Sequence, residues 1–507
     1  MRALLVTSVG VTCAAALTLP LATPAASAPA PHSASALPPS TSPASPGAGP
    51  PSAQAGATTR EALAPSDVRS AAEPAGSTQS LPLAPLDAPS DRVAGAAAAQ
   101  GLPQRDARPF SLVGVVWDDA EAELHGTVQV RTRATGTTRW SDWQDVETHN
   151  AEHAADLGSA EREGRTVRGA TAPLWVGDSD GVEVRVRPEA RDSQDRAATP
   201  VPLPEGMRLE LVDPGEGPGE DSGEDPGEAS APEPARGAPV GRAAAVPAGF
   251  ADIPPTATAL PEVLTAEIAA ASAVNAELAE LGATVIPALT QAETLESVEL
   301  APGAKPYIGP RPGIVTRKGW GADEKLREKN FAYTKTVKAA FVHHSATGNN
   351  YTCKQAPSVL RSIYRYHVKS SGWRDFGYNF AVDKCGNIYE GRAGGVTKAV
   401  LGAHTLGFNT NTMGIAVLGS YGSTNPPAAA VTAVSKLTAW KLGLFGRNPK
   451  GKITLVSGGS NKYKAGVKVK MNVISGHRDG FATECPGARL YKKLGKARTS
   501  SAKLQGR

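Results

Sequence analysis

Aromatic residues are scarce in this chain and absent from its first part. The 507-residue sequence has 7 Trp, 10 Tyr and 9 Phe; none precedes Phe110, and 20 of them lie in residues 307–507. Stretches without large apolar side chains cannot bury enough surface to offset the entropy lost on ordering them. This distribution excludes a single uniform globule and favours two folded regions that are preceded and joined by disordered segments.

Long apolar runs are also missing, apart from one near the N-terminus. Residues 4–21 are apolar, Arg2 precedes them, and the small residues 25–28 follow. These are the parts of a secretory signal peptide, which we assign to residues 1–28. A membrane anchor has a similar length, but this run contains Ser, Thr and Pro and has no basic stop-transfer flank. We therefore expect a secreted or cell-wall protein with no membrane span after cleavage.

Cysteine is rare, with four residues at Cys13, Cys353, Cys385 and Cys485. Cys13 lies in the signal peptide, so three cysteines remain after cleavage. In an oxidising compartment an odd number indicates one disulfide and one thiol with another task. The spacing of the three does not say which one is unpaired.

The small net charge of +4 hides a strongly uneven distribution of charge. Residues 307–507 carry 33 basic and 8 acidic side chains, whereas the first 306 residues carry 20 and 41. Nucleic acid is not expected as a partner, because no recognition helix, zinc-finger spacing or stacking-platform motif is present and export argues against it. Outside the cell, the basic region would be attracted to anionic wall polymers.

Composition divides the chain into six segments. They are a signal peptide (1–28), a disordered Ala/Pro/Ser-rich leader (29–104), a small antiparallel β domain (105–213), an acidic Gly/Pro linker with an Ala-rich helix (214–306), an α/β domain (307–497) and a tail (498–507). The β domain is predicted because short Val-rich segments such as 110–117 and 126–133 alternate and are separated by turn residues. Its Trp140 and Trp143 fit either a small core or a carbohydrate-stacking platform.

The last domain combines strand and helix patterns. Strands are predicted at residues 337–343, 378–383, 387–390, 413–418 and 473–475, and helices at 356–369 and 428–444. Either His343 or His344 could be a ligand at the end of one strand, and His477 follows a second strand. Cys485 precedes a further helix start. Zinc catalysis needs three such ligands and one open position. On spacing alone, a core histidine and a buried free thiol explain these residues better than a metal site does.

Five motifs in this region occur together in one order. They are Phe341-Val-His-His-Ser-Ala-Thr347, Gly372-Trp-Arg-Asp-Phe-Gly-Tyr-Asn-Phe380, Tyr389-Glu-Gly-Arg392, Gly402-Ala-His-Thr405, and Gly476-His-Arg-Asp479 with Glu484-Cys-Pro-Gly487. Together they resemble the peptidoglycan recognition protein family, which includes zinc N-acetylmuramoyl-L-alanine amidases. The resemblance covers residues 311–497 and implies an α/β domain with a central mixed β-sheet, flanking helices and a zinc-bearing groove.

The resemblance also implies roles for individual residues. The family's zinc ligands fall on His343, His477 and Cys485, whereas His344 falls on a position that the family does not use as a ligand. The family's catalytic tyrosine falls on Tyr378. Thr483 occupies a catalytic position where the related phage enzyme has lysine, and a threonine cannot supply a positive charge to the oxyanion.

Contacts with muramyl peptide are implied at four positions, His367, Tyr378, His404 and Asn409. His367 and His404 also fit simple capping or packing roles. With Cys485 assigned to zinc, Cys353 and Cys385 remain to form a disulfide.

The implied activity is hydrolysis of the amide between the muramic acid lactyl group and L-alanine in peptidoglycan, with Zn²⁺ as cofactor. We expect a monomer. The alternative is a non-hydrolytic peptidoglycan-binding module, because the family includes receptors with a degraded zinc site. Retention of the three matched ligands and of Tyr378 favours hydrolysis.

Overall fold

The computed structural model describes residues 76–86, 99–148, 150, 153–159, 161–189, 202–218, 264–298 and 306–507. All of them belong to one compact unit, Ser70–Arg507. The predicted signal peptide and most of the predicted leader and acidic linker lie outside the described residues. Within the described ranges, no helix has the length and apolar character needed to cross a bilayer.

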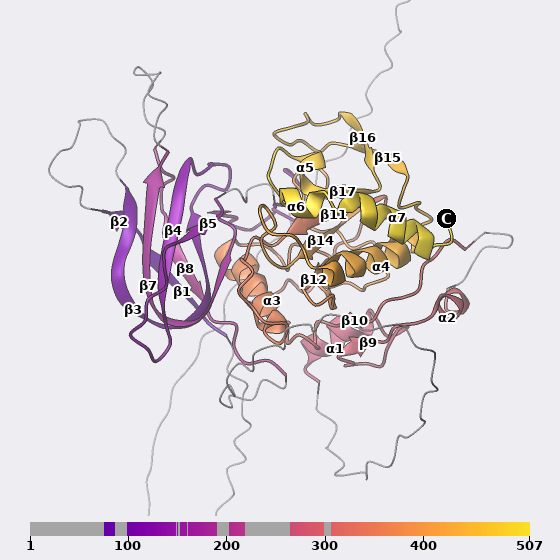
Figure 1. Cartoon of the computed structure of the whole chain (residues 1–507), viewed down its shortest axis with the longest axis horizontal. Helices are drawn as coiled ribbons and strands as arrows, with labels where there is room; N and C mark the ends of the chain where they lie inside the picture. Colours follow the sequence, from indigo (N-terminus) through magenta and orange to yellow (C-terminus); the bar gives the residue numbers. More distant parts are fainter. Residues whose placement is uncertain are drawn as a thin grey trace, which may run out of the picture. The chain divides into compact units, whose positions relative to one another are not determined.

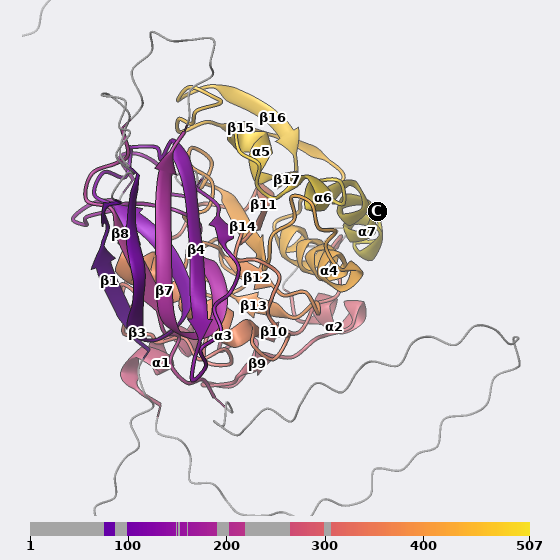
Figure 2. The ribbon, with the colours of Figure 1, turned by 60° about the vertical axis from the view of Figure 1, so that its left-hand side comes forward.

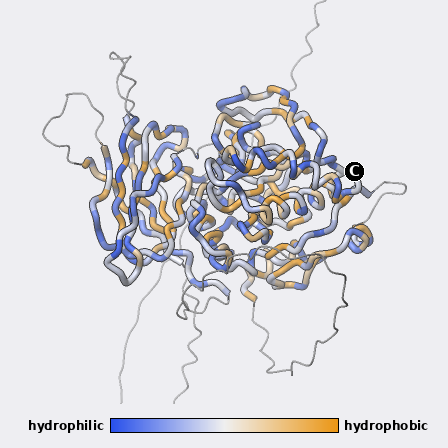
Figure 3. The backbone as a smooth tube through the Cα atoms, in the orientation of Figure 1, coloured by the Kyte–Doolittle hydropathy of each residue, from blue (hydrophilic) through white to orange (hydrophobic). Residues whose placement is uncertain are grey.

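The first domain is an antiparallel β-sheet (Figures 1 and 2). Its strands are β1 (Thr78–Pro82), β2 (Ala84–Pro85), β3 (Gln100–Trp117), β4 (Gly126–Ala134), β5 (Gln144–Val146), β6 (Gly169–Ala170), β7 (Leu174–Pro188) and β8 (Arg208–Val212). The main path is β1-β8-β3-β7-β4-β5, and β2 and β6 pair with β3. Figure 3 shows hydropathy alternating along its strands, as expected for a sheet with one face in a core. The antiparallel β domain is therefore confirmed.

The N-terminal boundary predicted for this domain was wrong. β1, β2 and the first residues of β3 lie within residues 29–104, which were expected to be disordered. β1 pairs with β8 over five residues, from Thr78↔Val212 to Pro82↔Arg208. Backbone pairing with an apolar strand orders this segment, although its own composition gives little sign of it.

The second domain is built on a mixed sheet in the order β17-β11-β14-β12-β13-β10-β9. Its strands are β9 (Val285–Ile286), β10 (Ile314–Val315), β11 (Ala339–His344), β12 (Phe380–Val382), β13 (Ile388–Glu390), β14 (Thr412–Val417) and β17 (Ile474–Gly476); β15 (Lys452–Val456) and β16 (Lys468–Asn472) form a separate pair. β11 pairs in parallel with both β14 and β17, whereas β12 and β13 are antiparallel. The predicted central mixed sheet is present.

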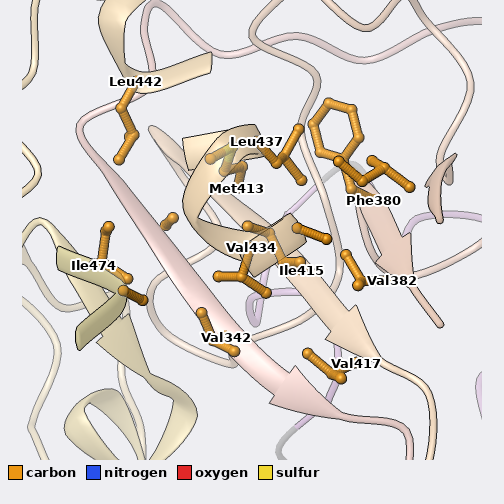
Figure 4. Packing of buried hydrophobic residues seen from close by; sticks show 14 of the residues in the cluster. Val342, Phe380, Val382, Met413, Ile415, Val417, Val434, Leu437, Leu442 and Ile474 are labelled. Atoms are coloured by element: carbon orange, nitrogen blue, oxygen red, sulfur yellow. The ribbon is translucent and has the colours of Figure 1, made fainter. Parts of the chain in front are cut away.

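Helices cover this sheet. They are α1 (Ala266–Ala273), α2 (Gln291–Glu296), α3 (Ala356–Arg365) with the π-helical turn η1 (Tyr366–Ser370), α4 (Ala428–Leu444), α5 (His477–Gly480), α6 (Ala488–Tyr491) and α7 (Leu494–Leu504). Val434 and Leu437 of α4 face Val342 and Ile415 of the sheet (Figure 4). α3 contributes to a second apolar cluster with other residues of the sheet. Because helices contribute to both clusters, every residue of β11 is buried, as is usual for a central parallel strand.

The predicted limits of the second domain also need correction. β9 pairs with β10, and Asn275 Nδ2 donates a hydrogen bond to Glu390 Oε1 at 2.9 Å, so part of the predicted linker 214–306 belongs to the domain. The predicted tail 498–507 continues α7 as far as Leu504. Both segments are ordered by contacts with distant parts of the chain, which local composition does not reveal.

The two domains share an apolar cluster. Leu112, Trp175 and Val212 of the β domain belong to the same cluster as Val359 and Ile363 of α3. The sheet of the N-terminal domain is therefore packed against α3 of the second domain.

The half-buried pair Trp140 and Trp143 lies outside the packed core of the β domain. The Arg185 guanidinium carbon lies 3.9 Å from the centroid of the Trp143 ring, and Arg131 and Arg133 lie over Trp140. Arginine side chains therefore lie over both rings, which are not part of the packed core, and the carbohydrate-stacking platform stays a prediction.

The predicted disulfide between Cys353 and Cys385 is present, with a Cα–Cα distance of 6.1 Å and a sequence separation of 32. We expect the double variant Cys353→Ser/Cys385→Ser to lose about 3 to 4 kcal/mol of unfolding free energy. Without the cross-link the unfolded chain gains conformational entropy, and for a loop of this length the gain stabilises the unfolded state by about that amount. Urea denaturation of the oxidised protein and the variant measures the difference. Reduced wild-type protein should match the variant, and equal midpoints for all three would contradict the prediction.

Candidate metal centre and active site

Two histidines meet at one edge of the sheet because their strands run in parallel. In the β11–β17 pair, Val342 is opposite Gly476. The next residues along the chain, His343 within β11 and His477 directly after β17, therefore lie side by side, and their ring centroids are 4.5 Å apart. Both side chains are fully buried.

Cys485 reaches the same place through a loop that folds back on itself. Arg478 N donates to the Cys485 carbonyl at 3.0 Å, which closes the loop between His477 and the cysteine. The thiol is buried, and its Sγ lies 3.7 Å from His343 Nδ1. The structure thus brings together the three residues that the resemblance assigns to the metal.

A fourth donor, His153, comes from the β domain. One donor atom from each of His153, His343, His477 and Cys485 lies within 4.8 Å of the others. His153 Nε2 lies 3.1 Å from His477 Nδ1, and its ring is 5.3 Å from the ring of His343, centroid to centroid. This residue was not predicted from the sequence.

The donor set is chemically suited to zinc. Imidazole nitrogens and a thiolate are its preferred ligands, and bond lengths of about 2.0 to 2.3 Å place tetrahedral donor atoms about 3.3 to 3.6 Å apart. The separations of 3.1 and 3.7 Å lie close to that range. Burial, followed by the neighbouring imidazoles, lowers the pKa of both His343 and His153 well below the usual value for histidine. Both rings are therefore neutral at pH 7, the form that binds a metal.

Tyr378 lies against this cluster. Its ring centroid is 5.2 Å from that of His343 and 6.0 Å from that of His153, and only 4% of its surface is exposed. The tyrosine precedes β12, the strand next to β14, and β14 in turn borders β11. The sheet order therefore brings Tyr378 to the metal cluster.

The other predicted substrate residues surround the cluster but are buried. The ring of His367 stacks on Trp373 with centroids 4.4 Å apart, and its Nδ1 accepts a hydrogen bond from Gly377 N. Burial, followed by the charge of Arg392, lowers the pKa of both His367 and His404 to about 3. His404 packs behind His343, with centroids 5.4 Å apart, and is fully buried.

Asn409 links the second domain to the β domain. Its Oδ1 accepts hydrogen bonds from the backbone of His404 and Thr405, while its Nδ2 donates to Ala154 O at 2.9 Å and to Asp156 Oδ1 at 2.8 Å. Both hydrogen bonds of the Asn409 side-chain NH₂ group are therefore made to residues of the β domain.

Thr483 and His344 lie beside the cluster without joining it. Thr483 Oγ1 accepts a hydrogen bond from Cys485 N at 3.1 Å, so this hydroxyl supports the turn that carries the thiol. His344 points elsewhere, with its Nε2 3.6 Å from Glu147 Oε2 of the β domain. Its absence from the donor group agrees with the sequence-based ligand set.

Comparisons with known proteins match both domains. Residues 333–488 match the family described as N-acetylmuramoyl-L-alanine amidase, and residues 65–204 match the family described as Rv3811 N-terminal galactose-binding domain-like. Peptidoglycan-recognition protein SC2 of Drosophila simulans is 30% identical over 183 residues, which are 36% of this chain and 84% of that protein. Human N-acetylmuramoyl-L-alanine amidase is 30% identical over 187 residues, covering 36% of this chain and 28% of that protein. Among solved structures, wild-type Drosophila PGRP-LB is 27% identical and covers 36% of this chain and 91% of that chain, with a TM-score of 0.27.

Proposed function

Since the chain belongs to the family of peptidoglycan recognition proteins and N-acetylmuramoyl-L-alanine amidases, we propose that it is a secreted, zinc-dependent amidase. Its substrate would be the amide that joins the lactyl group of muramic acid to L-alanine in peptidoglycan. The observation that carries the proposal is the buried group of His343, His477 and Cys485 with Tyr378 beside it.

Each of these residues would have its own role in amide hydrolysis. His343, His477 and Cys485 would hold the zinc ion, which supplies a Lewis acid and an acidified water when bound. The Tyr378 hydroxyl would donate a hydrogen bond to the oxygen that becomes negative in the tetrahedral transition state. Thr483 would keep the cysteine turn in place, because its hydroxyl already accepts from Cys485 N.

A non-hydrolytic peptidoglycan-binding module is the second candidate. A receptor requires a surface that binds peptidoglycan, but binding alone does not require a complete set of metal donors. This chain keeps both imidazoles, the thiol and the tyrosine in one buried cluster, which supports hydrolysis over binding alone.

Digestion of a defined substrate by the full chain tests the proposal. Purified protein loaded with one equivalent of zinc should release peptides with a new N-terminal alanine from a muramyl peptide, detected by mass spectrometry. Removal of zinc with a chelator should stop the release, and added zinc should restore it. Binding to peptidoglycan without release, in both the wild-type chain and the His153→Ala variant described below, would instead establish the binding module.

A further inference from the structure

The metal cluster contains one donor more than the proposed catalytic set. His153 belongs to the β domain, 324 residues away from His477 in the sequence, and is only 4% exposed. Its Nε2 faces His477, and its Nδ1 has no hydrogen-bond partner among the described residues. A catalytic zinc site keeps one position open, whereas a site with four protein ligands is closed.

His153 begins a stretch that we call the covering segment, residues 153–168, of which residue 160 lies outside the described part of the chain. The segment is the later part of the connection from β5 to β6 and has neither helix nor strand among its described residues. Close to His153, Ala154 O and Asp156 Oδ1 both accept from Asn409 Nδ2, and Asp156 Oδ1 also accepts from Gly407 N at 2.7 Å.

Further along, the covering segment is held by charged side chains. Glu161 Oε1 accepts from Arg392 Nη2 at 2.7 Å, and each of the two side chains is only 5% exposed. Arg374 donates to the backbone carbonyls of Glu161 and Glu163, both at 2.9 Å. Arg165 Nη1 donates to Trp373 O at 3.1 Å. Through these contacts the covering segment is attached to the second domain next to the metal cluster, at Trp373 as well as at Asn409.

The residues expected to bind muramyl peptide are covered in this arrangement. The exposed fractions of His367, Tyr378, His404 and Asn409 are 4%, 4%, 0% and 1%. In this arrangement these side chains are closed to a substrate, and the covering segment contacts two of them: His153 lies against Tyr378, and Ala154 and Asp156 accept from Asn409.

We infer that His153 is a fourth metal ligand and that the covering segment holds the enzyme in a latent form with a closed coordination sphere. Opening requires only the segment between β5 and β6 to leave, because the sheet behind it stays packed on α3 through the shared apolar cluster. The ligand assignment stands on the geometry of this chain, and only the consequence for the rate rests on the proposed amidase function.

Cobalt substitution of the full-length protein tests the ligand assignment without any measurement of activity. Azide should leave the visible spectrum of the wild-type cobalt protein unchanged, because no position is open to it. In His153→Ala, azide should shift the spectrum, and chelator competition should show zinc affinity lower by at least about 10-fold. The matched control His125→Ala, an exposed histidine of the same domain, should behave as wild type.

A second variant separates loss of the ligand from loss of folding. Asp156→Ala leaves all four donors in place but removes the carboxylate that accepts from Asn409 and Gly407. We expect it to be folded and to respond to azide between wild type and His153→Ala. Equal azide responses in wild type and His153→Ala would overturn the inference and leave His153 as a hydrogen-bond partner of His477 alone.

The rate of muramyl-peptide hydrolysis then tests whether the covering segment keeps the enzyme inactive. Because the bond from His153 to the metal would be one of the contacts that hold the covering segment closed, His153→Ala should hydrolyse muramyl peptide at least about 10-fold faster than wild type. This is the ratio expected when no more than a tenth of the wild-type chains are open. If the azide responses differ but neither protein hydrolyses the substrate, the fourth ligand stands and the amidase proposal fails. If the azide responses differ and the two rates are equal, the latency part of the inference is overturned.

Discussion

Replacing Cys485 by serine is expected to abolish amide hydrolysis, with a fall of more than about 10³-fold in rate. A neutral hydroxyl is a poor substitute for a thiolate, and the Lewis-acid contribution of a correctly held zinc ion amounts to several kcal/mol of barrier. The rate should be measured in both the wild-type and His153→Ala backgrounds, so that latency does not mask the loss. Metal content should be determined in the same samples.

Zinc content is the weaker readout for this variant, because three imidazoles remain in the described cluster: His153, His343 and His477. In the His153→Ala background only two would remain, and zinc should be lost as well. The matched control is Cys353→Ser/Cys385→Ser, which removes the other two cysteine sulfurs of the second domain and should keep zinc and activity below its melting temperature. More than a tenth of the activity left in Cys485→Ser would exclude the thiol as a ligand.

Tyr378→Phe is expected to reduce kcat by about 10² to 10³-fold while zinc remains bound. The substitution removes a single hydroxyl, and loss of one oxyanion donor has an effect of this size on kcat. Steady-state kinetics together with metal analysis would separate this result from loss of the site. A change confined to KM would place Tyr378 in substrate binding alone.

The control for this variant is Tyr364→Phe, which removes another buried hydroxyl. Tyr364 donates to Asp323 O at 3.2 Å, its ring packs under the Arg317 guanidinium, and it is not one of the four donors of the described cluster. It should lose some stability but retain kcat. If both variants lost kcat to the same extent, the effect of Tyr378→Phe would reflect general destabilisation.

The sheet and three of the four donors could be predicted because their signals are local. Alternation in residues 337–343 marked the strand that ends at His343, and the motifs around His477 and Cys485 matched a known order. The parallel pairing of β11 and β17 then brings the two histidines together with no further information.

His153 could not be predicted in this way. It occurs in an irregular stretch between two strands of another domain, and neither its spacing nor its neighbours carry a metal-binding pattern. Its position depends on how the β domain packs on α3, which is decided by residues such as Trp175 and Val359 that are far apart in the sequence. The ordered β1 strand and the helical end of the chain escaped prediction for the same reason, since distant contacts stabilise both.

The covering segment is attached at both ends, through β5 and β6, to a sheet that stays in place. Under the latency inference it therefore competes with substrate for the predicted muramyl-peptide site at an effective concentration set by its own short tether, on the order of millimolar, however dilute the protein is. Soluble muramyl fragments at low concentration would compete poorly with it. An intact wall, which presents many stem peptides in a small volume, would compete far better, so the chain would distinguish the assembled polymer from its released fragments by local density alone.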